Sequence, residues 1–152
     1  MLKVSTYIFS LLLISLSGCS CNEPPVVVED QTLLVGTWYI HDYTMENVSL
    51  YDIQKCDEGS WLRLDADNTM EALIKCNDPV NTYKGDWSAE GSTIYIDADN
   101  LFNVNKVLLR EVENTGTIVK LTDDELEFEF NAYSTLNVKL KVKAFLSRTP
   151  IN

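Results

Sequence analysis

Hydrophobic and polar residues alternate along most of the chain after residue 33. Apolar side chains alternate with glutamates over residues 126–130 and with lysines over residues 138–143. Such alternation buries one face of an extended strand and leaves the other face in water, as in antiparallel sheets. We find no convincing apolar stripe with the 3.6-residue period of a helix. The pattern therefore predicts an all-β domain.

Short polar clusters interrupt the alternation, and they contain the Asp, Asn, Gly and Ser residues that favour turns. Residues 114–116, with the sequence Asn-Thr-Gly, form one such cluster. The segments between the clusters are predicted to be strands near residues 35–44, 60–65, 69–76, 82–89, 92–97, 103–112, 116–121, 124–131 and 136–147.

The last two predicted strands also indicate how they pair. A hairpin that turns at Tyr133 sets Glu127 opposite Lys139 on one face and Phe128 opposite Val138 on the other. Opposite charges and apolar pairs across strands each contribute roughly 0.2–1 kcal/mol. A register shift of two residues keeps both faces, whereas a shift of one residue inverts them and is excluded.

The first 18 residues have the layout of a secretory signal peptide. A cation, Lys3, precedes an apolar run over residues 7–16, and the small residues Ser17 and Gly18 follow. That order is typical of export signals, and the run is shorter than the roughly 20 apolar residues that span a bilayer. We therefore expect residues 1–18 to be removed from the mature protein.

The next residue completes the sequence Leu16-Ser17-Gly18-Cys19, which resembles the lipobox of bacterial lipoproteins. The resemblance implies that the bond before Cys19 is cut and that Cys19 carries a diacylglycerol thioether and an acyl chain such as palmitate. Residues 19–32 contain two prolines and scattered charges, as expected for an extended, lipidated tether. The expected location is the bacterial cell envelope, on the outer membrane of a Gram-negative cell. The alternative is an ordinary signal peptide that is cut at another bond.

Charge and cysteines narrow the range of partners. The net charge of −11 at pH 7 argues against nucleic acid and against an anionic membrane surface.

Export places Cys56 and Cys76 in an oxidising compartment, where a disulfide between them would contribute about 3 kcal/mol in the chain-entropy model. Zinc binding is the competing interpretation, but His41 is the only histidine and no Cys-x-x-Cys pair exists. We therefore expect a disulfide, no metal and no cofactor.

Several short segments occur in an order that indicates a particular kind of barrel. In chain order they are Leu34–Trp38, Lys55–Asp57, Cys76, Gly85–Trp87, Ser92–Ile96, Ile118–Thr122, Glu125–Phe128 and Arg148. The order of these segments after the lipobox resembles that in the lipocalin superfamily and, more closely, that in the bacterial lipocalin-like lipoproteins. The resemblance covers most of residues 33–148.

The resemblance implies an antiparallel, up-and-down barrel of eight or nine strands over residues 33–152. In lipocalins the tryptophan of a Gly-x-Trp motif closes the barrel floor, and a basic residue near the end of the last strand packs over it. Carried over to this chain, these residues are Trp38 and Arg148, and their cation–π contact would contribute about 0.5–2 kcal/mol. The resemblance also implies a small apolar ligand in the barrel.

The side chains expected to face the interior are mostly large. Asp42 shares the inward parity of Trp38 and would supply a polar group towards the mouth. An eight-stranded barrel is only just wide enough for side chains or one small ligand. A filled interior would therefore make the protein an interaction or inhibitor module instead. The predicted ligand-lining residues are Ile40, Asp42, Leu64, Met70, Tyr83, Trp87, Ile96, Phe128 and Leu140.

No motif pairs a nucleophile with a base, as covalent catalysis requires. His41 lies between Tyr39 and Tyr43 on a predicted strand, where a surface position is the simplest interpretation. No catalytic residue is predicted. Three hypotheses remain, in decreasing order: binding of a small hydrophobic molecule, interaction with an envelope protein, and enzymatic activity.

The lipobox leads to a direct test. Cys19→Ala removes the thiol that would receive the lipid, so we expect the variant to stay uncleaved or to leave the membrane fraction. Fractionation of cells, combined with mass spectrometry of the N-terminus, measures both outcomes. Unchanged processing and unchanged membrane attachment would show that Cys19 is not the lipid site.

Overall fold

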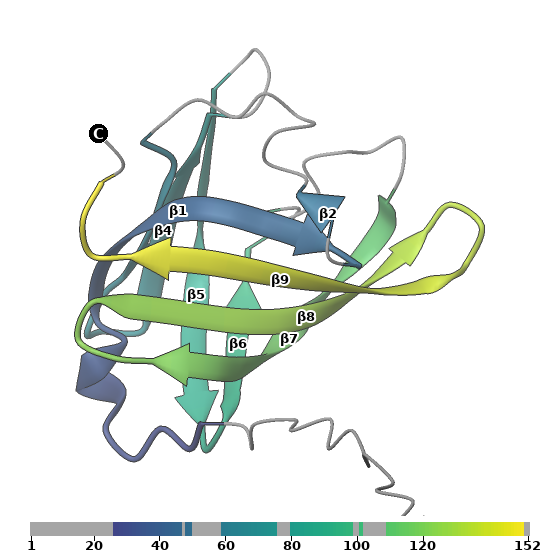
Figure 1. Ribbon diagram of the computed structural model, residues 1–152. Coiled ribbons are helices and arrows are strands. Elements are labelled where there is room, and N and C mark those ends of the chain that lie inside the picture. Colours follow the sequence, from purple (N-terminus) through teal and green to yellow (C-terminus); the bar gives the residue numbers. More distant parts are fainter. Residues whose placement is uncertain are drawn as a thin grey trace, which may run out of the picture.

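Nine antiparallel strands follow one another in the part of the chain that the computed structural model describes, which is residues 26–46, 48–49, 59–75, 80–98, 101 and 109–150. Each strand lies beside the next one in a single sheet, apart from β2, which lies at the far edge next to β1 (Figure 1). The elements are η1 (Gln31–Leu33), β1 (Gly36–Met45), β2 (Val48–Ser49), β3 (Trp61–Leu64), β4 (Thr69–Ile74), β5 (Asn81–Glu90), β6 (Thr93–Asp97), β7 (Leu109–Leu121), β8 (Glu125–Ser134) and β9 (Lys139–Ser147).

Pairing between the first and last barrel strands closes the sheet. The first residues of β1, Gly36 to Tyr39, pair with β3, and Tyr39 to Met45 pair with β9. Eight strands therefore form a closed barrel, while β2 pairs only with the end of β1. The predicted all-β, up-and-down antiparallel barrel is confirmed. Closure removes the exposed sheet edges that would otherwise pair with other chains.

The connections between strands alternate between two ends of the barrel because the strands run up and down. The short turns at 65–68, 91–92 and 122–124 lie at the end where β1 begins, together with η1. We call this the closed end. The strands β1, β4, β6 and β8 end at the opposite end of the barrel, which we call the open end.

The final hairpin turns at a different residue from the predicted one. Glu129 pairs with Lys143, which places the turn at Leu136 and not at Tyr133. The predicted register is therefore wrong, although the two faces are right because the shift is an even number of residues. The turn falls at this position because Asn137 adopts a φ of 61°, a left-handed conformation that asparagine tolerates better than most residues.

The turn predicted at residues 114–116 is also wrong. These residues lie inside β7, which continues from Leu109 to Leu121 with bulges on its β8 side, including one between Val112 and Gly116. A Cβ on Gly116 would lie 3.0 Å from the backbone oxygen of Glu129, so glycine serves close strand packing here. The earlier part of the predicted strand 103–112 lies mostly outside the described residues.

The barrel begins before the residue at which we placed the end of the tether. The amide of Val28 donates to the carbonyl oxygen of Gly91 at 2.8 Å, and that of Val26 donates to Ile118 at 3.3 Å. Val28 is also buried in the core. The tether expected over residues 19–32 therefore packs on the closed end from Val26 onward.

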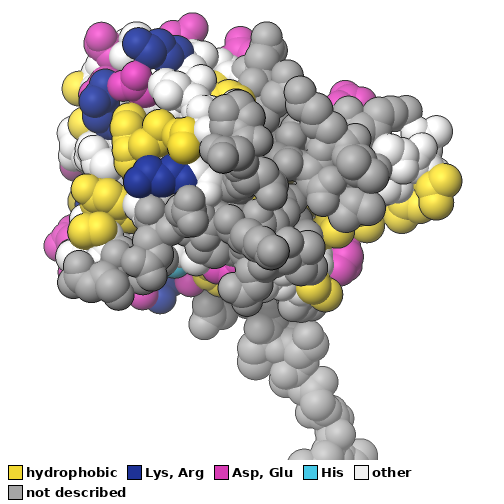
Figure 2. Space-filling view, turned by 90° about the horizontal axis from the view of Figure 1, so that it is seen from above, with side chains coloured by type: hydrophobic (Ala, Val, Ile, Leu, Met, Phe, Trp, Pro, Cys, Tyr) yellow, Lys and Arg dark blue, Asp and Glu magenta, His cyan; other side chains and the backbone are white. Residues whose placement is uncertain are grey.

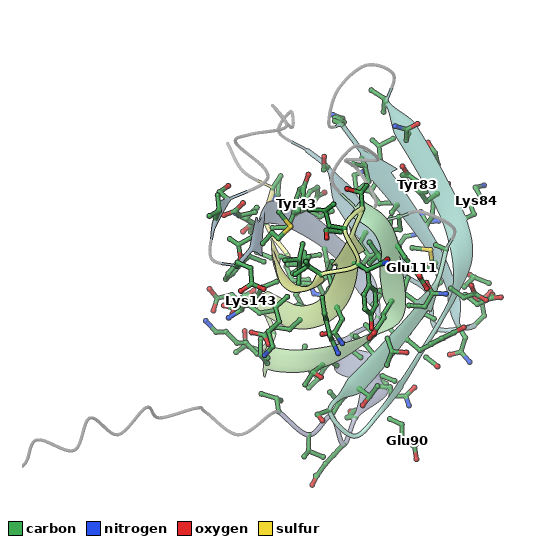
Figure 3. The ribbon with its side chains drawn as sticks, turned by 90° about the vertical axis from the view of Figure 1, so that its right-hand side faces the viewer. Tyr43, Tyr83, Lys84, Glu90, Glu111 and Lys143 are labelled. Atoms are coloured by element: carbon green, nitrogen blue, oxygen red, sulfur yellow. The ribbon has the colours of Figure 1, made fainter. Side chains whose placement is uncertain are left out.

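The core is formed by the inward-facing positions of all eight barrel strands. Figure 3 shows Lys84, Glu90 and Lys143 on the outside of the barrel. The alternation seen in the sequence is thus the alternation between core and solvent. The largest fully buried side chains are Trp38, Phe128, Leu34, Leu62, Leu64, Ile94, Ile118, Leu126 and Val142.

Gly85 provides a test of how closely β5 and β6 approach. A Cβ at this position would lie 1.9 Å from the backbone oxygen of Asp97, so Gly85→Ala must push the strands apart. We expect the free energy of unfolding to fall by about 3 kcal/mol, measured by urea denaturation and tryptophan fluorescence. Ser88→Ala, at an exposed position of the same strand, should change it by less than about 0.5 kcal/mol. Equal effects of the two substitutions would contradict the close approach.

Candidate functional site

The closed end is sealed by one aromatic ring and one cation. Trp38 is fully buried, and its Nε1–H donates to the carbonyl oxygen of Leu34 at 2.8 Å. The guanidinium carbon of Arg148 lies 3.6 Å from the centroid of the Trp38 ring. The structure therefore brings together the two residues that the resemblance placed at the barrel floor.

Arg148 also bonds to the backbone at the start of β1. Its guanidinium donates to the carbonyl oxygens of Leu33 at 2.8 Å, Val35 at 2.9 Å and Thr37 at 3.4 Å. Burial lowers the pKa of Arg148, and the nearby carboxylate of Asp124 partly offsets this effect. These bonds join the end of β9 to the beginning of β1, where the barrel closes.

The glycine of the Gly-x-Trp motif has a steric role in the same contact. Gly36 has a φ of 123°, and a Cβ on it would lie 2.5 Å from Nη1 of Arg148. Glycine is the residue that accepts this backbone conformation and leaves space for the guanidinium. The motif thus serves the seal of the closed end.

Most of the predicted ligand-lining residues are packed core. Six of the nine are between 0 and 6% exposed and belong to one cluster of buried side chains. Trp87, for example, donates from Nε1 to the carbonyl oxygen of Asp65 at 2.9 Å, close to a turn of the closed end. These side chains contribute to stability by filling the interior. The six residues are Ile40, Leu64, Met70, Trp87, Ile96 and Phe128.

Four of the partly exposed residues that pack against the core lie near the open end, whereas others, such as Val35 and Leu121, lie at the closed end. Tyr83, near the start of β5, and Leu140, near the start of β9, are half-buried, and burial raises the pKa of Tyr83. Met45 and Val112 are partly buried in the same way and were not predicted. We call these four residues, Met45, Tyr83, Val112 and Leu140, the rim.

Small side chains stand beside the rim. Ala72 pairs with Tyr83 on the neighbouring strand, and Ala132 pairs with both Leu140 and Val112. Directly paired residues share a face of the sheet, so both alanines point inward. These two alanines lie beside the rim, while the buried Tyr43 and Ile74 occupy other inward-facing positions in the same half of the barrel.

Asp42 does not point into the barrel, and its predicted role at the mouth is wrong. The register between β1 and β9 shifts between Ile40 and Asp42, so Asp42 pairs with the outward-facing Phe145. Its carboxylate accepts a hydrogen bond from the hydroxyl of Ser49 at 2.7 Å. The bulge inverts the parity of the second half of β1, which also explains why Met45 was missed.

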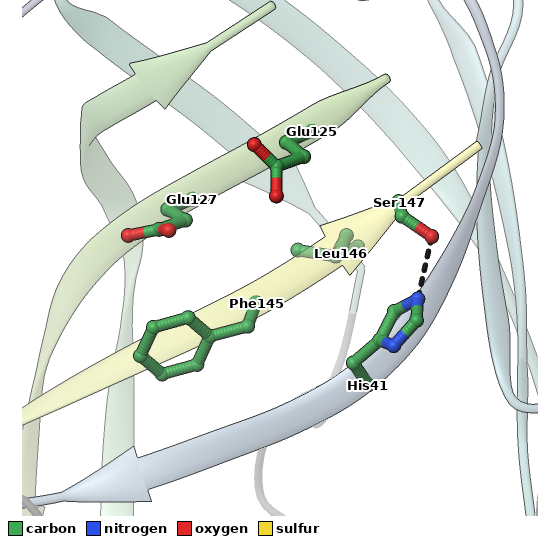
Figure 4. Close-up of a pocket in the computed structure, with 6 residues that line it drawn as sticks. All are labelled: His41, Glu125, Glu127, Phe145, Leu146 and Ser147. Carbon is green, nitrogen blue, oxygen red and sulfur yellow. Dashed lines mark hydrogen bonds between the residues drawn. The ribbon is translucent and has the colours of Figure 1, made fainter. Parts of the chain in front are cut away.

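The same bulge borders a pocket on the outer wall of the barrel (Figure 4). The pocket has a volume of about 230 Å³ and opens between β1, β8 and β9. It is separate from the interior that we expected to hold a ligand. The lining residues are His41, Glu125, Glu127, Phe145, Leu146 and Ser147.

His41 and Ser147 form a contact that superficially resembles a base and a nucleophile. Nε2 of His41 lies 2.5 Å from Oγ of Ser147. The Ser147 hydroxyl, however, donates to the carbonyl oxygen of Thr149 at 2.7 Å. Since the hydroxyl has only one proton, Oγ accepts from the Nε2–H of His41. In this arrangement His41 cannot remove the serine proton, so the pair is not set for nucleophilic catalysis.

The carboxylates of the outer pocket are already paired with lysines. Lys120 lies 2.6 Å from Glu125, and Lys143 lies 2.8 Å from Glu127. Nζ of Lys143 is also 5.0 Å from the centroid of the Phe145 ring. Within the described residues no group of three or more His, Cys, Asp and Glu side chains could hold a metal ion. The pocket is therefore a charge-balanced surface feature.

The cysteine predictions fall outside the described residues. These concern lipidation at Cys19 and the disulfide between Cys56 and Cys76, and both stay predictions. In the described ranges, no helix has the length and hydrophobicity needed to cross a membrane.

Eight antiparallel strands, closed on themselves and sealed at one end by Trp38 and Arg148, define a closed up-and-down β-barrel. The chain belongs to the lipocalin-like domain family, whose sequence model matches residues 34–128. Among solved structures, a redesigned β-barrel is similar at 18% identity with a TM-score of 0.46, covering 78% of this chain and 93% of that one. No curated protein sequence matches the chain.

The contacts of Arg148 lead us to expect that its removal strongly lowers the free energy of unfolding. Arg148→Ala leaves three carbonyl oxygens without their donor and removes the contact with Trp38, so we expect a loss of about 2–4 kcal/mol in the free energy of unfolding. Arg148→Lys should recover only part of it, because an ammonium group lacks the planar set of donors.

The control is Lys84→Ala, which removes an exposed lysine whose ion pair with Glu71 measures 3.5 Å. Such surface pairs contribute at most about 1 kcal/mol. Urea denaturation of all three variants provides the comparison. An Arg148→Ala protein as stable as Lys84→Ala would show that the barrel closes without the seal.

Proposed function

We propose that this protein is a non-catalytic, lipid-anchored lipoprotein of the bacterial envelope, and that its rim binds a small apolar molecule. The observation that carries the proposal is the partial exposure of the four rim residues. Buried side chains fill most of the interior, including Tyr43 and Ile74 in the open half, whereas the inward-facing residues of the rim stay partly exposed and largely apolar. Membership of the lipocalin-like domain family supports a binding role.

The ligand is held at the mouth and not deep in the barrel. Side chains such as Trp87 and Phe128 occupy the interior, and removing them would open a cavity at a cost of about 3–5 kcal/mol. A ligand at the rim needs no such rearrangement. It gains about 25 cal/mol for each Å² of apolar surface that it covers, before the cost of association.

The proposed anchor lies at the other end of the molecule from the rim. The chain joins the closed end at Val26, seven positions after the proposed lipid site at Cys19. Seven residues of extended chain span at most about 25 Å. The tether would therefore keep the closed end near the membrane and direct the open end away from it.

The second candidate function is an interaction module, which the filled closed half favours. In that case the open end would bind an envelope protein. Val48 in β2 and Val80 just before β5 are exposed aliphatic residues at this end that such a partner could cover. The absence of a saturable small-molecule site would favour this alternative.

A probe titration tests the binding proposal. We expect a neutral, environment-sensitive fluorophore to bind the mature protein saturably, and Tyr83→Ser or Leu140→Ser to weaken it about tenfold, as expected from the loss of 1–2 kcal/mol of apolar contact. Val80→Ser is the control, because Val80 is exposed at the same end but follows the outward-facing parity of β5. Equal binding by all variants would exclude the rim, and circular dichroism verifies that each variant is folded.

A further inference from the structure

The outward-facing residues of β8 and β9 pair opposite charges, and one aromatic residue interrupts this pattern. Glu129 pairs with Lys143, whereas Glu127, two residues earlier, pairs with Phe145. A ring therefore lies where the alternation along β9 would place another lysine. Phe145 is half-buried on the outer wall and does not belong to the hydrophobic core inside the barrel. Packing of the interior therefore does not explain its position.

Phe145 lines the outer pocket together with polar groups from both neighbouring strands. Because β9 lies between β8 and β1, Glu125 and Glu127 are on one side of the ring and His41 is on the other (Figure 4). The volume of about 230 Å³ is below the roughly 300 Å³ at which pockets for drug-sized molecules begin. The pocket is therefore of a size for one small ring, or for one unit of a longer chain.

The lining of the pocket is rich in hydrogen-bond acceptors. A carboxylate can accept about four hydrogen bonds, and the lysines paired with Glu125 and Glu127 each use only part of this capacity. Since the Nε2–H of His41 is bonded to Ser147, Nδ1 of the neutral imidazole is an acceptor as well. A ligand that carries several hydroxyl donors would complement these groups.

The balance of charge in the pocket favours a neutral ligand. Lys120 and Lys143 offset the charges of Glu125 and Glu127, so a cation would compete with the lysines and an anion would be repelled by the carboxylates. A neutral molecule leaves both ion pairs in place, and the ammonium of Lys143 has further N–H donors for a ligand oxygen. Basic, acidic and hydrophobic side chains also lie side by side at the left of Figure 2, on the side where β1 and β4 lie in Figure 1.

The ring of Phe145 adds an apolar platform to these polar groups. The C–H bonds on one face of a sugar ring are weakly positive and pack against the negative face of an aromatic ring. The Phe145 ring already attracts a positive group, because Nζ of Lys143 lies 5.0 Å from its centroid. Lys143 is also paired with Glu127 at 2.8 Å, so it keeps a partner when a ligand covers the ring.

Two more aromatic residues continue the outer wall beyond the pocket. Tyr39 on β1 pairs with Ser147 on β9, and Trp61 on β3 pairs with Tyr39. Both are half-buried and face outward, because their neighbours Trp38 and Leu62 are buried inside the barrel. Aromatic residues therefore lie on adjacent strands, next to a pocket that takes a single ring.

We propose that the outer pocket binds a neutral saccharide, with one sugar unit on Phe145 between Glu127 and His41 and the next unit over Tyr39. The hydroxyl groups of the sugar donate to the carboxylate and to the imidazole, and its apolar face covers the ring. This site lies on the outside of the barrel, so it is independent of the ligand proposed for the rim.

Titration of the mature protein with maltohexaose, cellohexaose, mannohexaose and chitohexaose, followed by ligand-observed NMR, tests the proposal. We expect at least one of these neutral oligosaccharides to bind saturably. Phe145→Ala and Phe145→Leu should each weaken it about tenfold because they remove the flat ring, whereas Phe145→Trp should retain it. The matched control is Tyr95→Ala, which removes a 41% exposed aromatic residue from β6, a strand that does not border the pocket, and should change nothing.

Three results would overturn the inference. If none of the four oligosaccharides binds, the pocket is not a saccharide site, and the fluorophore titration of the rim still decides the other proposal separately. If Phe145→Leu binds as tightly as the parent, the aromatic ring is not the platform. If spermidine binds saturably, the saccharides do not, and Glu127→Gln abolishes the binding, the pocket is a cation site instead. Circular dichroism verifies that each variant is folded.

Discussion

The contact between Arg148 and the first strand is the interaction on which the barrel depends. It joins residues more than one hundred positions apart in the sequence. The guanidinium covers Trp38 and donates to carbonyl oxygens of residues just before and at the start of β1. A closed barrel has to bring its first and last strands together, and long-range pairing of this kind carries a large entropic cost. The guanidinium of Arg148, the ring of Trp38 and the backbone carbonyl oxygens lie together at this junction. Their contacts offset the entropic cost of closing the barrel.

Sealing one end assigns different physical roles to the two ends. At the closed end, the interior is closely packed, and this packing stabilises the folded barrel. At the open end, rim residues such as Tyr83 and Leu140 remain partly exposed, so apolar surface stays available. The bulge in β1 contributes to this division, because it turns Met45 towards the interior and Asp42 away from it. The outer pocket at His41 lies beside the same irregularity, and the Ser147 hydroxyl in it donates to the carbonyl oxygen of Thr149.

Several errors of prediction from the sequence share one cause, which is that local pattern does not encode strand register. The alternation of Glu129 and Lys143 with apolar neighbours determined their faces, but the turn at Leu136 depended on the left-handed conformation of Asn137. Gly116 appeared to mark a turn, yet it allows close approach to another strand. Parity counted along β1 failed after the bulge, since one extra residue moves every later side chain to the opposite face.

The sequence by itself determined the all-β class and the faces of most strands, because these follow from a two-residue period, and its resemblance to lipocalins indicated the two residues of the seal, Trp38 and Arg148. Only the tertiary structure decided which inward-facing residues are buried and which reach the rim. That distinction depends on the tilt, bulges and closure of the sheet, which place Trp87 among packed side chains and Leu140 at the mouth. Inward parity is a local property of a strand, whereas depth inside a barrel is a property of all eight strands together.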